Sequence, residues 1–366
     1  MKVSVITMHA VKNYGSVLQT YATQTVLNSL GCETEIINYI RKKNLDSNLA
    51  DTWTVNDHGV KKIIKKVILY PTIARWKKVF GGYLRANINL SEHTYSSSED
   101  FVQNPIVSDV YCTGSDQVWN SGWNQGIEEP FFLNFAPETA KKISIAASIG
   151  KTELAESEIA TIKPMLKRYN AISMREMSGV DVVKGMGISN VHFCLDPTLL
   201  LPKEKWLDHA IGIKVPEKYI LVYQLNHDGK FDDYAVEVAK RKKLPLLRVC
   251  TRFDQQRLPG KAIVIPEIQQ LLTLFNKAEL VITNSFHATA FCINLNKNFI
   301  SIYPNEYSCR LGDALAMFGL QSRHLANYEQ YELADEIIDF KPVNEILDQK
   351  RKESMVVIKS MLGLDK

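Results

Sequence analysis

A histidine follows an apolar run late in the sequence, in a position suited to proton transfer beside an anionic ligand. His287 belongs to the segment TNSFHA (residues 283–288), about four residues past the apolar run 279–283. In open α/β sheets, ligands bind outside the carboxyl ends of the strands, and this is such a position. Histidine can supply a proton at neutral pH. We therefore predict that His287 is catalytic and that Ser285 contacts the same ligand; the alternative for His287 is a structural role.

A second polar cluster ends another apolar run, in the segment GSDQVWN (residues 114–120). Its carboxylate, Asp116, could accept a proton or a hydrogen bond from a sugar hydroxyl. Trp119 could stack against the sugar ring, and Ser115 and Gln117 are expected to bind the same substrate. The alternative is a capped turn without a ligand.

Two charged residues follow short apolar runs in the middle of the chain. Arg175 comes after the run 171–174, and Asp196 comes after the run 191–194. The planar guanidinium of an arginine suits a carboxylate or a phosphate, so Arg175 is predicted to clamp an anion and Asp196 to lie in the same site. The alternatives are a surface salt bridge for Arg175 and a turn cap for Asp196.

The first β-to-α turn has the sequence Asn13-Tyr14-Gly15-Ser16. A glycine there permits close backbone approach, and the following helix N-terminus favours an anion. With a single glycine, the turn matches neither a dinucleotide fingerprint nor a P-loop, so we predict a different substrate contact. Arg310 opens a later predicted helix and could add a second cation beside His287.

The elements that would position these residues alternate between strand and helix, as in a doubly wound fold. The expected strands are residues 2–8, 33–39, 109–113, 142–147, 171–174, 191–194, 218–224, 245–250, 262–265, 279–283 and 298–302. The expected helices are residues 16–30, with Ser16 as N-cap, and 153–169, 231–242, 267–275, 310–318 and 343–362.

The length of 366 residues exceeds what one hydrophobic core usually supports, which predicts two domains. We expect two doubly wound Rossmann-like α/β domains in a GT-B-like arrangement, with a ligand cleft between them. The first is residues 1–202, on the acceptor side, with a polar insertion at about 41–104. The second is 203–342, on the donor side, and a long C-terminal helix covers 343–366.

Composition excludes several classes of protein. Apolar residues make up 45% and charged residues 23% of the chain, which is typical of a globular protein. The formal net charge of +4 does not suggest a nucleic-acid partner. The six cysteines are scattered without metal-ligand spacing, so we expect reduced, mostly buried thiols and no bound metal. With neither a signal peptide nor an apolar run of membrane-spanning length, we expect a cytoplasmic protein.

Residues 61–78 combine lysines with aliphatic and aromatic residues. This pattern is typical of a basic amphipathic helix, which could hold the protein peripherally at the inner membrane face. The alternative is an exposed helix with no membrane contact.

Taken together, five segments resemble the polysaccharide pyruvyl transferase family along nearly the whole chain. They are NYGSVLQ (13–19), GSDQVWN (114–120), SMRE (173–176), LDPTLL (195–200) and TNSFHA (283–288). Each segment is unspecific alone, whereas five in this order are specific.

The resemblance implies a GT-B-like fold and transfer of the enolpyruvyl group of phosphoenolpyruvate to a glycan acceptor, which could be lipid-linked. No cofactor is implied. It supports His287 as general acid and Arg175 as clamp; Asp116 as base and Arg310 as phosphate ligand are our own inferences. Family members carry an arginine near the position of Ser285, so either Arg310 compensates or the donor differs.

Two other functions remain open at this stage. A GT-B glycosyltransferase would use a nucleotide sugar and would need an acidic residue for the ribose, for which Glu306 or Asp313 could serve. A non-catalytic module would bind a glycan without turnover.

Overall fold

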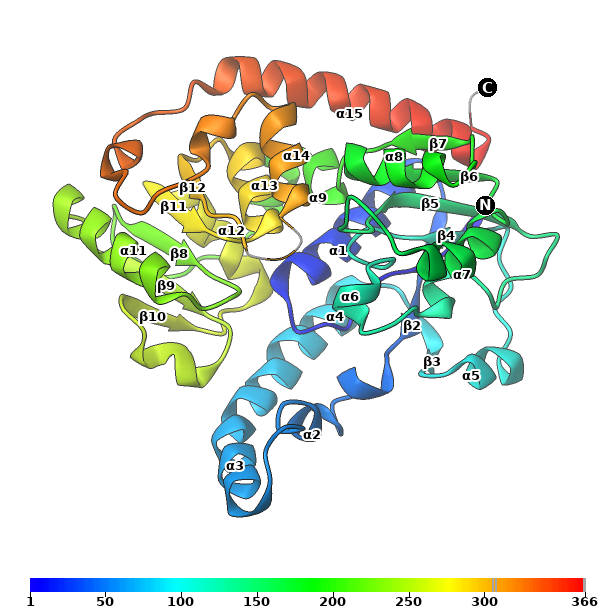
Figure 1. Cartoon of the computed structure of the whole chain (residues 1–366), viewed down its shortest axis with the longest axis horizontal. Helices are drawn as coiled ribbons and strands as arrows, with labels where there is room; N and C mark the ends of the chain where they lie inside the picture. The colour runs from blue at the N-terminus through cyan, green and yellow to red at the C-terminus, as the bar shows by residue number, and fades with distance from the viewer. Residues whose placement is uncertain (305, 307, 365–366) are drawn as a thin grey trace. The chain divides into compact units, whose positions relative to one another are not determined.

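The computed structural model describes residues 1–304, 306 and 308–364, and the chain divides into two compact α/β units. Unit 1 comprises residues 1–45, 83–200 and 348–366, and unit 2 comprises residues 46–82 and 201–347. Each unit contains one parallel sheet (Figure 1). The prediction of two parallel-sheet α/β domains is confirmed.

The sheet of unit 1 has seven strands in the order β3-β2-β1-β4-β5-β6-β7, and each pair of neighbours is parallel. Its strands are β1 (Lys2–Ile6), β2 (Glu33–Tyr39), β3 (Leu90–Tyr95), β4 (Val110–Thr113), β5 (Lys141–Ala147), β6 (Ala171–Met174) and β7 (Val191–Phe193). The inner strands are buried along almost their whole length, which explains why they are short, nearly continuous apolar runs.

The helices of unit 1 lie between consecutive strands of its sheet, except α9 (Pro197–Leu200), which follows the last strand, β7. They are α1 (Tyr14–Ser29), α4 (Gly82–Asn87), α5 (Ser98–Gln103), α6 (Ser121–Asn124), α7 (Glu156–Leu166), α8 (Met177–Gly185) and α9. Helix α1 packs against both β2 and α9, and most of its residues are buried. Its N-cap is Asn13, whose side chain accepts a hydrogen bond from the Gly15 amide, so the expected cap at Ser16 is wrong.

The sheet of unit 2 has five parallel strands in the order β10-β9-β8-β11-β12. Its strands are β8 (Ile220–Tyr223), β9 (Leu246–Cys250), β10 (Lys261–Val264), β11 (Leu280–Thr283) and β12 (Phe299–Ser301). Its helices are α2 (Leu49–Thr52), α3 (Gly59–Trp76), α10 (Lys203–His209), α11 (Gly229–Lys242), α12 (Ile268–Lys277), α13 (Phe286–Leu295) and α14 (Cys309–Met317).

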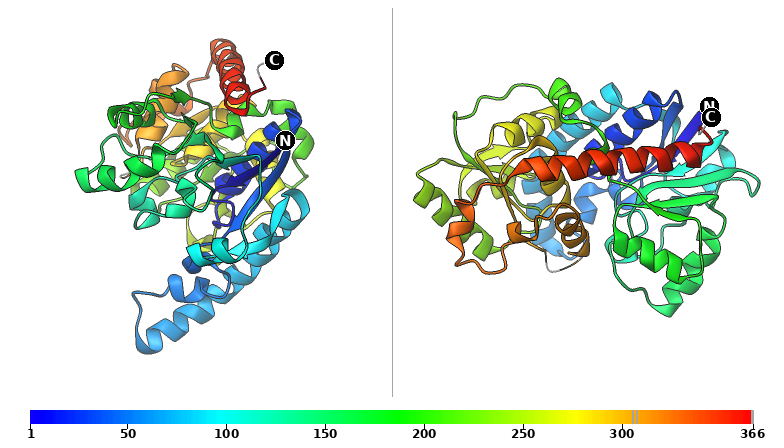
Figure 2. Two further views of the ribbon diagram at one scale, coloured as in Figure 1. Left: turned by 90° about the vertical axis from the view of Figure 1, so that its right-hand side faces the viewer. Right: turned by 90° about the horizontal axis from the view of Figure 1, so that it is seen from above.

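The long terminal helix α15 (Phe340–Leu362) is continuous (Figure 2), as expected from the sequence. Its first residues are assigned to unit 2 and the rest, from Asp348, to unit 1. Within the described residues, no helix is both long and apolar enough to cross a membrane.

The expected insertion at 41–104 contains structure that the sequence pattern did not indicate. Strand β3 lies inside it, at one edge of the unit 1 sheet, and three of its six residues are exposed. An edge strand with this polar composition lacks the apolar run by which the other strands were identified. Residues 46–82 group with unit 2, because α3 packs against the segment Phe253–Arg257 of that unit.

Candidate functional site

The strand order reverses at one point in each sheet, and these points locate the candidate site regions. In unit 1 the reversal lies between β1 and β4, and in unit 2 it lies between β8 and β11. Loops that leave neighbouring strands in opposite directions open a crevice at the carboxyl edge of a parallel sheet. The loops after these four strands contain many of the predicted site residues.

In unit 1 the turn into α1 approaches the turn after β4. The hydroxyl of Ser16 donates to Oδ2 of Asp116 at 2.5 Å, and Thr7 donates to the Ser115 carbonyl at 2.8 Å. Gly114 makes this approach possible, because a Cβ atom there would lie 2.9 Å from Cβ of Thr7. Ser16 and Asp116 thus come together, as the prediction of a shared site requires.

Asp116 has an unusual backbone. Its φ angle is +77°, in the left-handed region that few residues other than glycine, asparagine and aspartate adopt. The turn is stabilised by the Gln117 amide, which donates to Oδ1 of Asp116 at 2.8 Å. Such conformations cost free energy and often occur at functional positions.

Arg175 is surrounded by carboxylates. Its Nη1 lies 2.9 Å from Oδ2 of Asp196, Nη2 lies 3.6 Å from Oδ1 of Asp116, and Nε lies 3.6 Å from Oε2 of Glu176. Its side chain is completely buried. The carboxylates raise the pKa of Arg175 although burial opposes this, so the group is firmly cationic.

These contacts change the interpretation of the residues around Arg175. Asp196 also accepts from the hydroxyls of Ser115 and Thr198, at 2.8 and 2.7 Å, and is itself buried. These three side chains hold the strand ends and Asp116 in place. That Arg175 clamps a donor and that Ser115 and Asp196 bind substrate stay predictions.

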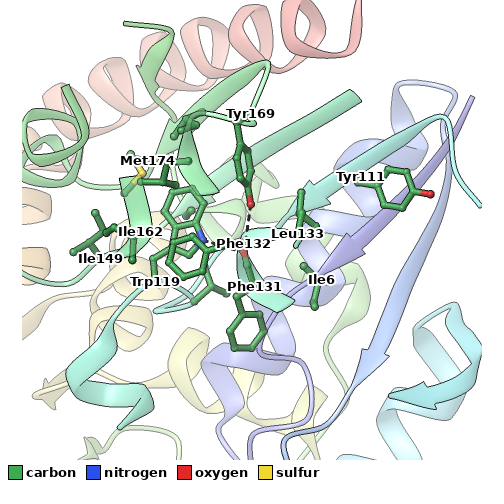
Figure 3. Close-up of a cluster of buried hydrophobic side chains, with 14 of the residues drawn as sticks. Ile6, Tyr111, Trp119, Phe131, Phe132, Leu133, Ile149, Ile162, Tyr169 and Met174 are labelled. Carbon is green, nitrogen blue, oxygen red and sulfur yellow. Dashed lines mark hydrogen bonds between the residues drawn. The ribbon is translucent and has the colours of Figure 1, made fainter. Parts of the chain in front are cut away.

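Trp119 is a core residue, not a sugar platform. Its ring stacks on Phe132 and meets Tyr169 edge-on, and its indole nitrogen donates to the Phe131 carbonyl at 2.9 Å (Figure 3). Only 2% of its surface is exposed. With no open face, the predicted stacking of Trp119 on a substrate is wrong.

The neighbouring predicted residues also support the turns. Gln117 is buried and its Oε1 accepts from Nδ2 of the Asn120 side chain at 2.7 Å, close to Gly150. Tyr14 and Gly15 are buried at the start of α1, where Asn13 caps the helix. These contacts explain the residue types by folding, and a substrate contact of these residues stays a prediction.

In unit 2, the predicted residues Ser285 and His287 lie at the first turn of α13, and the predicted residue Arg310 lies beside the ring of Phe286. Ser285 is the N-cap, and its hydroxyl accepts from the Ala288 amide at 3.4 Å. His287 lies in that turn and is 7% exposed. The guanidinium of Arg310, from α14, lies 5.9 Å from the ring centre of Phe286, the residue between the other two. A helix N-terminus, a histidine and an arginine together form an environment suited to an anion.

A pocket of about 370 Å³ opens beside this turn, at the carboxyl ends of β8, β11 and β12. It is lined by Asn226, His227, Asp228, Lys230, Phe231, Asn284, Ile302, Tyr303, Pro304 and Tyr328. Asn284 joins the two central loops, because it accepts from the Leu225 amide at 2.8 Å and donates to the Asn226 carbonyl at 2.9 Å. The volume is within the range of small-molecule sites.

Buried polar groups position the pocket wall. Arg248 pairs with Asp232 at 2.5 Å, and Asp232 is 3.1 Å from the ring nitrogen Nε2 of His227. Tyr328 donates to Asp228 at 2.9 Å, and burial, together with that carboxylate, raises the pKa of Tyr328. The phenol therefore stays protonated at neutral pH and remains a hydrogen-bond donor.

His227, Lys230 and Tyr328 were not identified from the sequence. The segment NHDGK (226–230) begins two residues after the end of the predicted strand 218–224 and includes a helix cap, which was the available signal. Tyr328 comes from a distant loop and had no local signal. Glu306, considered for a ribose, is exposed, and Asp313 is half-buried on α14.

Comparisons with known proteins agree with this architecture. Residues 13–306 match a family model described as polysaccharide pyruvyl transferase. No curated protein matches the sequence significantly. The residues that carry the earlier resemblance all lie within the matched range.

Several solved structures share the fold at low identity. The UDP-GlcNAc 2-epimerase of Methanocaldococcus jannaschii, in complex with UDP-GlcNAc and UDP, has 13% identity and a TM-score of 0.57, with 99% of each chain covered. The UDP-N-acetylglucosamine 2-epimerase of Rickettsia bellii has 9% identity and a TM-score of 0.54, covering 98% of this chain and 96% of its own. The spinosyn rhamnosyltransferase SpnG has 10% identity and a TM-score of 0.50, covering 99% and 100%. The predicted GT-B-like fold is thus confirmed.

Proposed function

The chain belongs to the polysaccharide pyruvyl transferase family, and on that basis we propose that it transfers the enolpyruvyl group of phosphoenolpyruvate to a sugar. The acceptor is a sugar of a cell-surface polysaccharide or of its precursor, and the product is a pyruvate ketal on two of its hydroxyl groups.

The observation that carries this proposal is the first turn of α13. Phosphoenolpyruvate is a small, highly charged anion that needs both positive charge and a proton donor. Ser285 and His287 lie at this helix N-terminus, and the guanidinium of Arg310 lies 5.9 Å from the ring centre of Phe286, the residue between them. Arg310 supplies the charge that Ser285 lacks, and Lys230 of the adjacent pocket adds a second cation.

The proposed reaction begins with proton transfer. His287 protonates the methylene carbon of phosphoenolpyruvate, which places positive charge on the carbon that bears the phosphate. One acceptor hydroxyl adds to that carbon and loses its proton to a base. The bond from this carbon to the phosphate oxygen then breaks, inorganic phosphate leaves, and a second hydroxyl adds to close the ketal. One proton enters the methyl group, and the two hydroxyl groups release two.

We assign the base to Asp116. Ser16 and Arg175 hold its carboxylate in place, and the left-handed backbone fixes its direction. Arg175 then acts as a positioning residue, because its own contacts are with carboxylates of the protein. Preorganised groups of this kind lower the cost of ordering the transition state.

The test is incubation of the purified chain with a panel of glycan acceptors and either phosphoenolpyruvate or UDP-sugars. We expect phosphate release from phosphoenolpyruvate together with an acceptor mass increased by a pyruvate ketal. Transfer of a sugar from a UDP-sugar would instead support a glycosyltransferase. Absence of turnover, with binding of a glycan, would support a non-catalytic module.

A further inference from the structure

Helix α3 has an exposed face made of aliphatic side chains. Val60, Ile63, Ile64, Val67 and Ile68 follow the spacing that brings residues to one side of a helix. They are between 55% and 71% exposed. We call these five residues the apolar face of α3. A contiguous apolar surface of this kind on a folded protein usually marks a contact with something else.

The opposite side of the same helix packs against the rest of unit 2. Leu69, Thr72, Ile73 and Trp76 are buried, and the Trp76 indole donates to the Thr251 carbonyl at 2.8 Å. Arg75 pairs with Glu267 at 3.0 Å. Helix α2 packs against α3, and both form one hairpin in Figures 1 and 2. One side of α3 is therefore already covered by the rest of unit 2, and the apolar face is a separate, exposed surface.

Four lysines lie beside and behind the apolar face. By helical spacing, Lys61 lies at one edge of it, Lys65 and Lys66 lie farther round on either side, and Lys62 lies on the opposite side. Lys61 and Lys65 share Asp57, with shortest distances of 3.5 and 2.6 Å, and Lys62 and Lys66 share Asp51 at the same distances. Because only two aspartates pair with these four lysines, the group of six side chains keeps a net positive charge.

The charge of the whole chain is concentrated in this segment. Residues 46–82 contain seven Lys and Arg residues and three Asp residues, a net charge of +4, equal to the formal net charge of all 366 residues. The rest of the chain is therefore balanced. An apolar face with cations beside and behind it fits the interface of a bilayer, where aliphatic groups enter the acyl region and lysines reach anionic headgroups.

We propose that α3 docks the protein on the surface of an anionic lipid bilayer, with its apolar face inserted and its lysines against the headgroups. Within the described residues no helix is long and apolar enough to cross a membrane. We propose that α3 lies on the surface of the bilayer. A second copy of this chain is the competing occupant, but it would bring its own excess of positive charge to the contact. The charge balance thus favours lipid.

The test is co-sedimentation of the full chain with vesicles of equimolar phosphatidylglycerol and phosphatidylcholine, compared with vesicles of phosphatidylcholine alone. We expect strong preference for the anionic vesicles. The triple variant Ile63→Ser, Ile64→Ser, Val67→Ser should reduce partitioning on the order of 100-fold, because three aliphatic side chains no longer leave water. Changing Lys61, Lys62, Lys65 and Lys66 to Gln should reduce it about 10-fold or more for anionic vesicles only.

The matched control changes three more exposed aliphatic residues elsewhere, Val102→Ser, Val107→Ser and Ile337→Ser, which are at least 80% exposed. This variant should bind vesicles as the wild type does. Melting temperatures separate loss of binding from loss of folding. Equal binding by the wild type and the α3 triple variant would overturn the proposal. The proposal would also be overturned if the wild type formed a dimer and did not bind vesicles, while the triple variant was a monomer.

Discussion

The Nη1 atom of Arg175 lies 2.9 Å from Oδ2 of Asp196, and both side chains are fully buried. Asp116 and Glu176 lie near the same guanidinium. Charges in such a position are stable only as a set, because each carboxylate without the cation would be buried and uncompensated. The cluster therefore links the stability of unit 1 to the position of its candidate base.

Replacing Arg175 by Met should lower the free energy of unfolding by about 3–5 kcal/mol, since the buried carboxylates lose their cation. Urea denaturation measures this change. The double variant Arg175→Met, Asp196→Asn should be less destabilised than the sum of the two single variants, because the pair is coupled. Additive effects would show that the two residues do not interact as described.

Asp116→Asn should reduce kcat by about 10²–10⁴-fold, because the amide cannot take the acceptor proton. Asparagine also tolerates the left-handed backbone, so the melting temperature should stay near that of the wild type. Steady-state phosphate release measures kcat. The control Ser115→Ala changes a neighbouring hydroxyl that bonds Asp196, and it should affect stability more than kcat. Full activity in Asp116→Asn would remove Asp116 as the base.

Trp119→Ala should lower the free energy of unfolding by about 3–5 kcal/mol, because it leaves a cavity between Phe132 and Tyr169. Trp119→Phe should cost less, since it keeps most of the ring contacts. If Trp119 bound substrate instead, both variants would raise KM for the acceptor while leaving stability unchanged.

How well the sequence predicted the fold depended on burial. Central strands such as β6, which is predicted to the residue, are short apolar runs because both faces of the sheet are covered. The edge strand β3 lacked that pattern. His287 and Arg310 were selected from the sequence because they are recognisable residue types near predicted strand ends, whereas the role of Ser285 as the N-cap of α13 was not predicted.

The surroundings of Trp119 and of Arg175 were not predicted, for a common reason. Polar neighbours in the sequence suggested exposure for Trp119, whereas its surroundings come from residues 131–132 and 169. The partners of Arg175 are equally distant, at positions 116 and 196. Residue type showed that a strong interaction was present, but the partner depended on the tertiary structure.

The buried His9 predicts a pH dependence of stability. Burial lowers the pKa of His9 below its usual value of 6.5, although its hydrogen bonds to Asn38 and to the Thr7 carbonyl oppose this. Between the folded and unfolded pKa values the unfolded chain binds more protons. The contribution of neutral His9 to the free energy of unfolding is therefore fully present above its pKa in the unfolded chain. It is lost as the pH falls towards its lower pKa in the folded protein, by at most about 1.4 kcal/mol per pH unit.

Melting temperatures of wild type and His9→Gln between pH 7.5 and pH 5 check this contribution, and the variant should lose less stability on acidification. Burial also lowers the pKa of His209, but that group is common to both proteins. The same slope in both proteins would show that His9 does not contribute.

The most direct test of the proposed reaction is mass spectrometry of the acceptor after incubation with phosphoenolpyruvate in D₂O. Because His287 exchanges its proton with solvent, its transfer to the methylene carbon should place a single deuterium in the methyl group of each ketal. His287→Ala should lower the yield by about 10²–10⁴-fold. An acceptor that gains no pyruvate from phosphoenolpyruvate, or a ketal formed without deuterium, would contradict the account.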